Sequence, residues 1–189
     1  MYSNNIIFMD GEFAKLKPDG IDLLSIGLVK PNGEELYLEI EFDGEIDPWV
    51  KKNVFPYLTG EKVSREEAAK KIRSFIGKSK PHLVAYVNQF DWMGICKLFD
   101  ANNPSQISER IPFHCVPIDF SSMLFERGIE PGIPPTKIAN QYGIDISDIN
   151  EHNALDDAKL LKRLYDKIIK IHWIYSSIII FVFEITFFA

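Results

Sequence analysis

Cysteine is scarce in this chain, whose 189 residues include only two. Cys96 and Cys115 both lie in predicted apolar elements, so we expect them to be reduced core residues of a cytosolic protein. A disulfide or a metal site built on these cysteines is the less favoured alternative.

Internal repeats and low-complexity stretches are also missing, while the apolar fraction of 46% is that of a globular protein. The chain is long enough to bury a substantial core, so we expect one compact domain over residues 1–170. Residues 1–5 are mostly polar and a predicted strand follows at once. We therefore expect no signal peptide and a cytoplasmic location.

Positively charged residues are fewer than negatively charged ones: the chain has 21 Lys and Arg and 27 Asp and Glu, for a net charge of −6. This balance is not typical of a protein with an extended nucleic-acid-binding face, because such faces neutralise many phosphates with Lys and Arg. The modest basic patches are Lys51-Lys52, Lys70-Lys71, and Lys78 with Lys80. Each is more typical of a solvated surface, and contact with backbone phosphates is the alternative.

A long apolar run occurs at the C-terminal end, over residues 171–183, and Glu184 interrupts it. A membrane span needs roughly 20 mostly apolar residues, and this segment reaches that length only by including His172 and Glu184. We treat residues 171–189 as a hydrophobic tail with three open interpretations. It packs on the domain or across a homodimer interface, it anchors the protein at the inner face of a membrane, or it is a frayed or non-native end.

The first of three acidic clusters is Asp10-Gly11-Glu12, which follows the short apolar run of residues 5–9. Strand side chains two residues apart share a side, so Asp10 and Glu12 project together if the extended backbone persists through Gly11. Such a carboxylate pair can chelate one cation, and Gly11 leaves the opposite side open to close approach. The alternative is a strand that ends in a polar turn.

The second cluster ends at Asp91, between the apolar β-type run of residues 82–87 and a stretch with helical spacing that extends to Phe99. Asp91 therefore lies where a strand passes into a helix. It can cap that helix. Alternatively, it lies at the carboxyl end of a strand, where open α/β sheets collect their ligands.

The third cluster, over residues 152–157, is the most specific of the three. An apolar stripe that includes Leu155 and Leu161 predicts a helix, with Asp157 in its first turns and His152 in the loop before it. A histidine can accept a proton from water near neutral pH, so His152 is a candidate general base. The alternative is that Asp156 and Asp157 only complement the helix dipole.

In this order the three clusters are similar to the motifs of the DEDDh 3′–5′ exonucleases of the ribonuclease H-like superfamily. The first motif is Asp-x-Glu, the second contains Asn-x-Phe-Asp, and the third is His-x-Ala-x-x-Asp. The matching residues are Asp10 and Glu12, then Asn88, Phe90 and Asp91, then His152, Ala154 and Asp157.

The spacing of the third motif matches Asp157 and not its neighbour Asp156. Asn153 occupies the position where the tyrosine-type branch of the family has a tyrosine, so the resemblance favours the histidine branch. Two further stretches, residues 21–29 and 47–54, resemble the small bacterial 3′–5′ exoribonucleases typified by a mycobacterial protein. The resemblance covers roughly residues 6–169 and leaves out the tail.

The resemblance implies hydrolysis of phosphodiester bonds from the 3′ end, with release of nucleoside 5′-monophosphates. Asp10, Glu12 and Asp157 would hold one Mg²⁺, and Asp91 would help to bind a second. Mn²⁺ can substitute in such sites. His152 would act as the general base, and Glu12 with Phe13 would contact the terminal nucleotide.

RNA ends are the expected substrate. The alternatives are DNA ends, in repair or proofreading, and a ribonuclease H-like module that binds nucleic acid or protein without cleavage. No residue can be assigned from the sequence to read the 2′-hydroxyl that distinguishes RNA from DNA.

The predicted fold is α/β and ribonuclease H-like, with a mixed five-stranded sheet flanked by helices. Residues 31–33, Pro-Asn-Gly, predict a turn between the second and third strands. Ser64, with Glu67 three residues later, predicts the start of a helix. The predicted strands are residues 6–10, 23–29, 36–42, 83–87 and 114–118. The predicted helices are residues 65–76, the segment after Asp91, and residues 120–127, 136–142 and 155–169.

Overall fold

The computed structural model describes residues 5–17 and 20–170, which form a mixed sheet of six strands in the order β4-β3-β2-β1-β5-β6. The first three strands are an antiparallel meander, and the β3–β4, β1–β5 and β5–β6 pairs are parallel. The strands are β1 (Ile6–Lys17), β2 (Gly20–Val29), β3 (Glu35–Ile40), β4 (Lys62–Val63), β5 (His82–Ala85) and β6 (Ile118–Asp119). The predicted fold class is confirmed, with one strand more than predicted.

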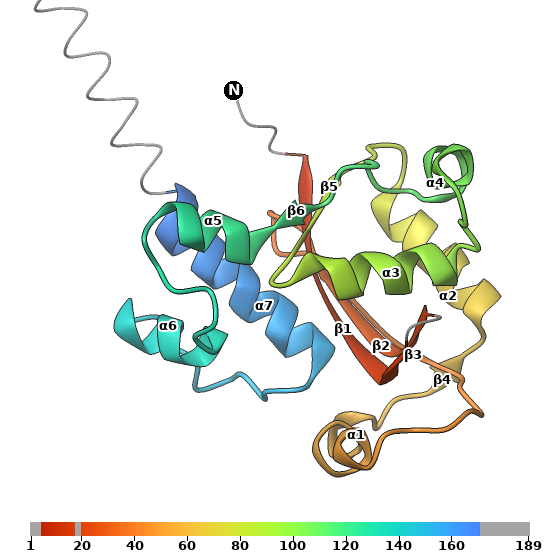
Figure 1. Ribbon diagram of the computed structural model, residues 1–189, viewed down its shortest axis with the longest axis horizontal. Coiled ribbons are helices and arrows are strands. Elements are labelled where there is room, and N and C mark those ends of the chain that lie inside the picture. Colours follow the sequence, from red (N-terminus) through yellow and green to blue (C-terminus); the bar gives the residue numbers. More distant parts are fainter. Residues whose placement is uncertain (1–4, 18–19, 171–189) are drawn as a thin grey trace, which may run out of the picture.

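Helices cover both faces of this sheet, with α5, α6 and α7 on one side and α2, α3 and α4 on the other (Figure 1). The helices that follow the meander are α1 (Pro48–Asn53), the short 3₁₀ helix η1 (Phe55–Tyr57), α2 (Arg65–Ile76), α3 (Asn88–Leu98) and α4 (Pro104–Arg110). Those of the C-terminal half are α5 (Phe120–Glu126), α6 (Pro135–Gln141), α7 (Ala154–Leu164) and its π-helical continuation η2 (Tyr165–Lys170).

Alternation along β1 divides the core between these two layers. Ile6 and Phe8 are buried with α5, α6 and α7, whereas Ile7 and Met9 are buried with α2 and α3. Side chains of a strand point alternately to opposite faces, so a strand that is apolar on both sides must be covered on both sides. The run of apolar residues before Asp10 therefore makes β1 a central strand of the sheet.

Several local predictions are confirmed by the backbone. Helix α2 has the predicted bounds, and the Ser64 hydroxyl accepts a hydrogen bond from the Glu67 amide at 3.2 Å. The predicted turn is closed by the Gly33 amide, which donates to the Lys30 carbonyl at 2.9 Å, and Gly33 has a φ of +91°. The apolar stripe of the last helix is buried against the sheet, as expected.

Other local predictions were wrong or incomplete. The strand expected at residues 114–118 is reduced to Ile118–Asp119, and β4, α1 and α4 were not predicted. Strand β4 has two residues and pairs only with the end of β3, too short to show alternation. Cys96 is partly buried in α3 as a free thiol, but Cys115 is exposed, because the chain around it is not a strand.

The hydrophobic tail, residues 171–189, lies outside the described residues, so its role stays a prediction. Over residues 5–17 and 20–170, no helix combines the length and the apolar character required to span a membrane.

The start of α7 lies directly on β2 at Gly27. A Cβ atom added to Gly27 would be 2.2 Å from the Ala154 carbonyl oxygen. Real Cβ atoms do not approach backbone that closely, so only glycine allows α7 to begin where it does.

We therefore expect Gly27→Ala to push α7 away from the sheet and to lower the free energy of unfolding by about 1–3 kcal/mol, the usual cost of overpacking. Thermal or urea unfolding measures the loss. Gly132→Ala is the matched control, because its Cβ would meet only Glu130 Oε1 at 3.4 Å. Equal stability of the two variants would contradict this account of the contact.

Candidate active site

Strand β1 presents the first two candidate ligands. Its ladder with β2 is regular through Asp10, Gly11 and Glu12, and the first irregularity comes between Glu12 and Phe13. Asp10 and Glu12 therefore stay two residues apart on an unbroken strand and project to the same side, as the sequence predicted. The structure places the bulge after the pair, where it no longer affects their alignment.

Asp91 approaches this strand from the other side. It is the fourth residue of α3, in the first turn of that helix, and it is 6% exposed. A Cβ on Gly11 would lie 3.2 Å from Asp91 Oδ1, so glycine at this position lets the carboxylate reach the backbone of β1. The Asp91 Oδ1 atom is buried and has no hydrogen-bond partner among the described residues.

Asp157 and His152 come from the start of α7 and the loop before it. Asn153 caps the helix, its side-chain oxygen accepting hydrogen bonds from the amides of Leu155 and Asp156 at 3.1 and 3.2 Å. The His152 amide donates to Asp157 Oδ2 at 2.9 Å. His152 has a φ of +69°, in the left-handed region that non-glycine residues rarely adopt. Residues in such backbone regions cluster at functional sites, although Lys80 and Asp100, away from this site, also have positive φ values.

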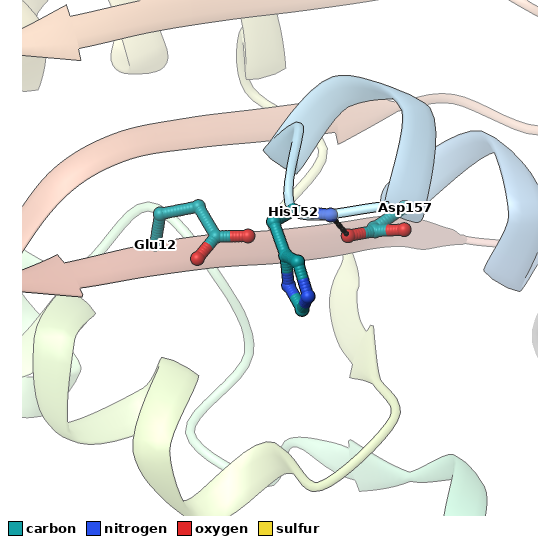
Figure 2. A group of neighbouring side chains, drawn as sticks. All are labelled: Glu12, His152 and Asp157. Carbon is teal, nitrogen blue, oxygen red and sulfur yellow. Dashed lines mark hydrogen bonds between the residues drawn. The ribbon is translucent and has the colours of Figure 1, made fainter. Parts of the chain in front are cut away.

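Three of these side chains meet closely enough to share a metal ion. Glu12, His152 and Asp157 each offer a ligand atom, and these atoms lie within 4.8 Å of one another. Figure 2 shows Glu12 on β1, Asp157 on α7 and His152 on the loop before α7, with the His152 side chain between the two carboxylates in this view. The first and third sequence clusters are therefore brought together in space.

Electrostatics couples the four predicted carboxylates. Burial raises the pKa of Asp10 well above its usual value, and the charges of Asp157, Asp91 and Glu12 raise it further. Burial also raises the pKa of Glu12 and of Asp91 to about 8, with Asp157 and Asp91 adding to the effect at Glu12. The pKa of Asp157 rises to about 7, again chiefly through burial.

This donor set fits a divalent metal ion. Carboxylate oxygens are the ligands that Mg²⁺ and similar hard cations prefer. The like-charged, largely buried carboxylates and the unpartnered Asp91 Oδ1 atom leave negative charge and acceptor capacity that no described cation satisfies. Asp10, Glu12, Asp91 and Asp157 are thus the residues that would hold metal, with His152 beside them.

A cavity of about 340 Å³ opens beside these residues, within the range of small-molecule sites. Asp10, Asp91, His152 and Asp157 line its polar side. Its apolar side comes from several elements: Phe13 of β1, Tyr86 and Phe90 near α3, Pro134 and Pro135 at α6, and Leu160 and Leu161 of α7. Phe13, predicted as a substrate contact, is therefore placed at the cavity, next to Glu12.

Sequence reasoning missed two neighbours of His152. The Trp49 ring, 54% exposed on α1, lies edge-on to the His152 ring with centroids 5.0 Å apart. Glu151 lines the cavity and accepts a hydrogen bond from the Thr136 hydroxyl at 2.7 Å. Glu151 could have been noticed as an acidic residue adjacent to His152. Trp49 lies in residues 47–54, which resemble the small exoribonucleases, but neither its spacing nor its neighbours in the chain assign it to the site.

The shifted carboxylates predict how stability depends on pH and metal. Unfolded carboxylates titrate near pH 4, whereas Glu12, Asp91 and Asp157 titrate near 7 to 8 in the fold. Between these values the folded state binds more protons than the unfolded state, so metal-free stability falls as pH rises from about 4 to about 8.

We expect a divalent cation to replace those protons, and so to raise the melting temperature more at pH 8 than at pH 5. Thermal unfolding with EDTA or Mg²⁺ at both pH values measures this, and the Asp10→Asn/Asp157→Asn double variant should lose most of the metal effect. An equal rise at both pH values in the unmodified protein would contradict the assignment.

Among the comparisons with known proteins, only the one with solved structures finds matches, and these concern the fold. No protein-family model and no curated protein matches the sequence. Solved structures do match: Escherichia coli exonuclease I in complex with a dT13 oligonucleotide has a TM-score of 0.65 at 17% identity, over 90% of this chain and 42% of that one. Exonuclease I from Methylocaldum szegediense has the same TM-score and identity, over 87% and 41%.

The zinc-bound complex of E. coli exonuclease I with single-stranded DNA matches similarly, with a TM-score of 0.65 at 16% identity over 86% of this chain. This chain spans about two fifths of the length of these proteins. None of these neighbours belongs to the mycobacterial type, so that narrower resemblance remains a prediction from the sequence. The chain has the ribonuclease H-like fold that exonuclease I also has.

Proposed function

We propose that this protein is a metal-dependent 3′–5′ exonuclease that removes nucleoside 5′-monophosphates from nucleic acid ends. The observation that carries the proposal is the meeting of Glu12, His152 and Asp157 within 4.8 Å, where His152 and Asp157 also line a nucleotide-sized cavity. Asp10 and Asp91 add two further carboxylates to the same region. Fold alone would not establish the activity, since one fold hosts many functions.

Each residue has a role in this proposal. Asp10, Glu12, Asp91 and Asp157 hold the metal ions, with Mg²⁺ as the expected occupant. When bound, two such ions would supply Lewis acidity and neutralise charge at the scissile phosphate. His152 accepts the proton of the attacking water.

The substrate is held by the surroundings of these groups. The apolar side of the cavity, which includes Phe13 and Phe90, offers ring faces and edges to the terminal nucleoside. Its limited volume suits one unpaired nucleotide better than a base pair. We therefore expect single-stranded ends to be cut faster than blunt duplex ends.

RNA is the substrate that we favour, because the stretches at residues 21–29 and 47–54 resemble small bacterial exoribonucleases. DNA is the second candidate, favoured by the complexes of exonuclease I with dT13 and with single-stranded DNA. The 2′-hydroxyl is the chemical difference that a site must read to separate the two.

The test uses purified protein with end-labelled RNA and DNA of the same sequence, single- and double-stranded, with Mg²⁺ or EDTA. We expect stepwise shortening of 5′-labelled single strands and release of 5′-monophosphates, both abolished by EDTA. Faster cleavage of DNA than RNA would replace the RNA assignment while leaving the exonuclease proposal intact. No cleavage of any substrate, with metal bound and the protein folded, would overturn the proposed function.

A further inference from the structure

The loop before α7 ends in a turn over residues 150–153, which two neighbouring carboxylates of α7 hold. In the second half of the turn, the His152 amide donates to Asp157 Oδ2 at 2.9 Å. At its start, Asp156 Oδ2 accepts two hydrogen bonds from Asn150, from its backbone amide at 3.1 Å and from its side-chain amide at 2.8 Å. Adjacent residues of a helix point about 100° apart, so one carboxylate can face the metal group while the other faces the loop.

Asp156 is itself fixed to the sheet through a charged chain. Lys159 Nζ lies 3.6 Å from Asp156 Oδ1 and 3.1 Å from Glu35 Oε2 on β3. The Asp156 side chain is only 14% exposed, so its hydrogen bonds are partly shielded from water. Hydrogen bonds to a charged acceptor are stronger than neutral ones. Asp156 therefore connects Asn150, the first residue of the turn, to the sheet, although Asp156 lies outside the proposed metal group.

The loop needs such a restraint because its conformation is strained. His152 has a φ of +69°, and the Asn153 amide closes a turn onto the Asn150 carbonyl at 3.1 Å. A short loop in an unfavourable conformation relaxes when an end is released, unless other contacts determine it. Asn150 is exposed, and its two hydrogen bonds to Asp156, with the Thr136–Glu151 hydrogen bond beside them, restrain the chain just before His152.

We propose that Asp156 is a positioning residue for His152, the general base of the proposed exonuclease reaction. Its carboxylate fixes Asn150, and Asn150 fixes the turn over residues 150–153. The turn then determines where the imidazole of His152 lies relative to Glu12 and Asp157. The expected loss of rate rests on the proposed function, whereas the expected restraint of the His152 turn rests on the geometry alone.

The kinetic test is a double-mutant cycle on Mg²⁺-dependent cleavage. Asp156→Ala should lower kcat by up to about 10²-fold, the scale of a misplaced catalytic group, with little change in KM or in the Mg²⁺ concentration needed. In a His152→Ala background the same substitution should cost nothing further, because the group that it positions is gone. Equal losses in both backgrounds would overturn the proposal.

Two variants separate positioning from general damage. Asp156→Asn keeps a side-chain oxygen that can accept from the Asn150 amide, so it should recover most of the rate. Asp148→Ala is the control, because it breaks an exposed ion pair with Arg163, on a side chain whose hydrogen bonds go to Arg163 and not to residues 150–153. Its kcat should match that of the unmodified protein.

A measurement without substrate decides the structural part, whatever the enzyme cleaves. The rate of amide hydrogen exchange at His152 and the line width of its ring signals should increase in Asp156→Ala. They should also increase in Asn150→Ala, which removes the side-chain hydrogen bond between Asn150 and Asp156. Unchanged exchange and ring signals in a folded Asn150→Ala protein would refute the restraint. If the unmodified protein cleaves nothing, the proposed function fails and this measurement still tests the restraint.

Discussion

Replacing Asp157 by alanine should abolish hydrolysis in a protein that remains folded. Asp157 contributes to the three-residue group with Glu12 and His152, and its Oδ2 also accepts the His152 amide. One substitution therefore removes a metal ligand and releases the loop that carries the base. The expected effect is the largest of any single change in this chain, comparable only to that of Asp10→Ala.

The measurements are cleavage of an end-labelled strand, the circular dichroism spectrum and the melting temperature with and without Mg²⁺. The metal-induced rise in melting temperature should disappear together with the activity. Asp157→Asn and Asp156→Asn form the matched pair, since they make the same change at neighbouring positions, and Asp156→Asn should retain far more activity. Normal rates in correctly folded Asp157→Ala protein would end the metal assignment, and the reverse ranking of the two positions would show that the register of the third motif is wrong.

The second large effect is expected at His152. Loss of a general base typically costs roughly 10²–10⁴-fold in rate. His152→Ala should therefore turn over slowly while it still binds Mg²⁺, because four carboxylates remain around the site. Single-turnover rates and the Mg²⁺-dependent rise in melting temperature measure the two properties separately.

Backbone strain complicates the alanine variant, and a second variant removes the complication. Alanine is less tolerant than asparagine of the +69° φ of His152, so His152→Asn keeps the backbone while it removes the imidazole. Equal losses in both variants would assign the effect to the ring. His82→Ala is the control, because His82 lies at the start of β5 and is not among the residues that line the cavity. Its ring contacts the His114 ring instead, with centroids 4.0 Å apart. Full activity of both His152 variants would make this histidine structural.

The parts of the fold that sequence could predict are those set by local periodicity. Alternation through Gly11 placed Asp10 and Glu12 on one side of a strand, and the ladder is regular over these residues. Helix α2 was bounded by its cap at Ser64, which the structure retains. These features depend on neighbours in the chain, so the information is present in a short window of sequence.

The parts that sequence could not predict depend on contacts distant in the chain. Strand β4 exists only because Lys62 and Val63 meet the end of β3. The exposure of Cys115 follows from the irregular path between α4 and β6, and apolar neighbours in sequence suggested burial instead. The approach of Trp49 to His152 joins α1 to the loop before α7. Spacing along the chain carries no signal for a contact of this kind.

The lining of the cavity has a consequence for the order in which its occupants arrive. Among the described residues that line it are four carboxylates, Asp10, Asp91, Glu151 and Asp157, and no lysine or arginine. A polyanion that enters a metal-free cavity is repelled by these carboxylates once they are ionised, and no lysine or arginine among the described lining residues offsets that repulsion. Under the proposed function, we therefore expect metal binding to precede substrate binding. A shortage of divalent ions would then lower the affinity for nucleic acid ends as well as the rate of cleavage.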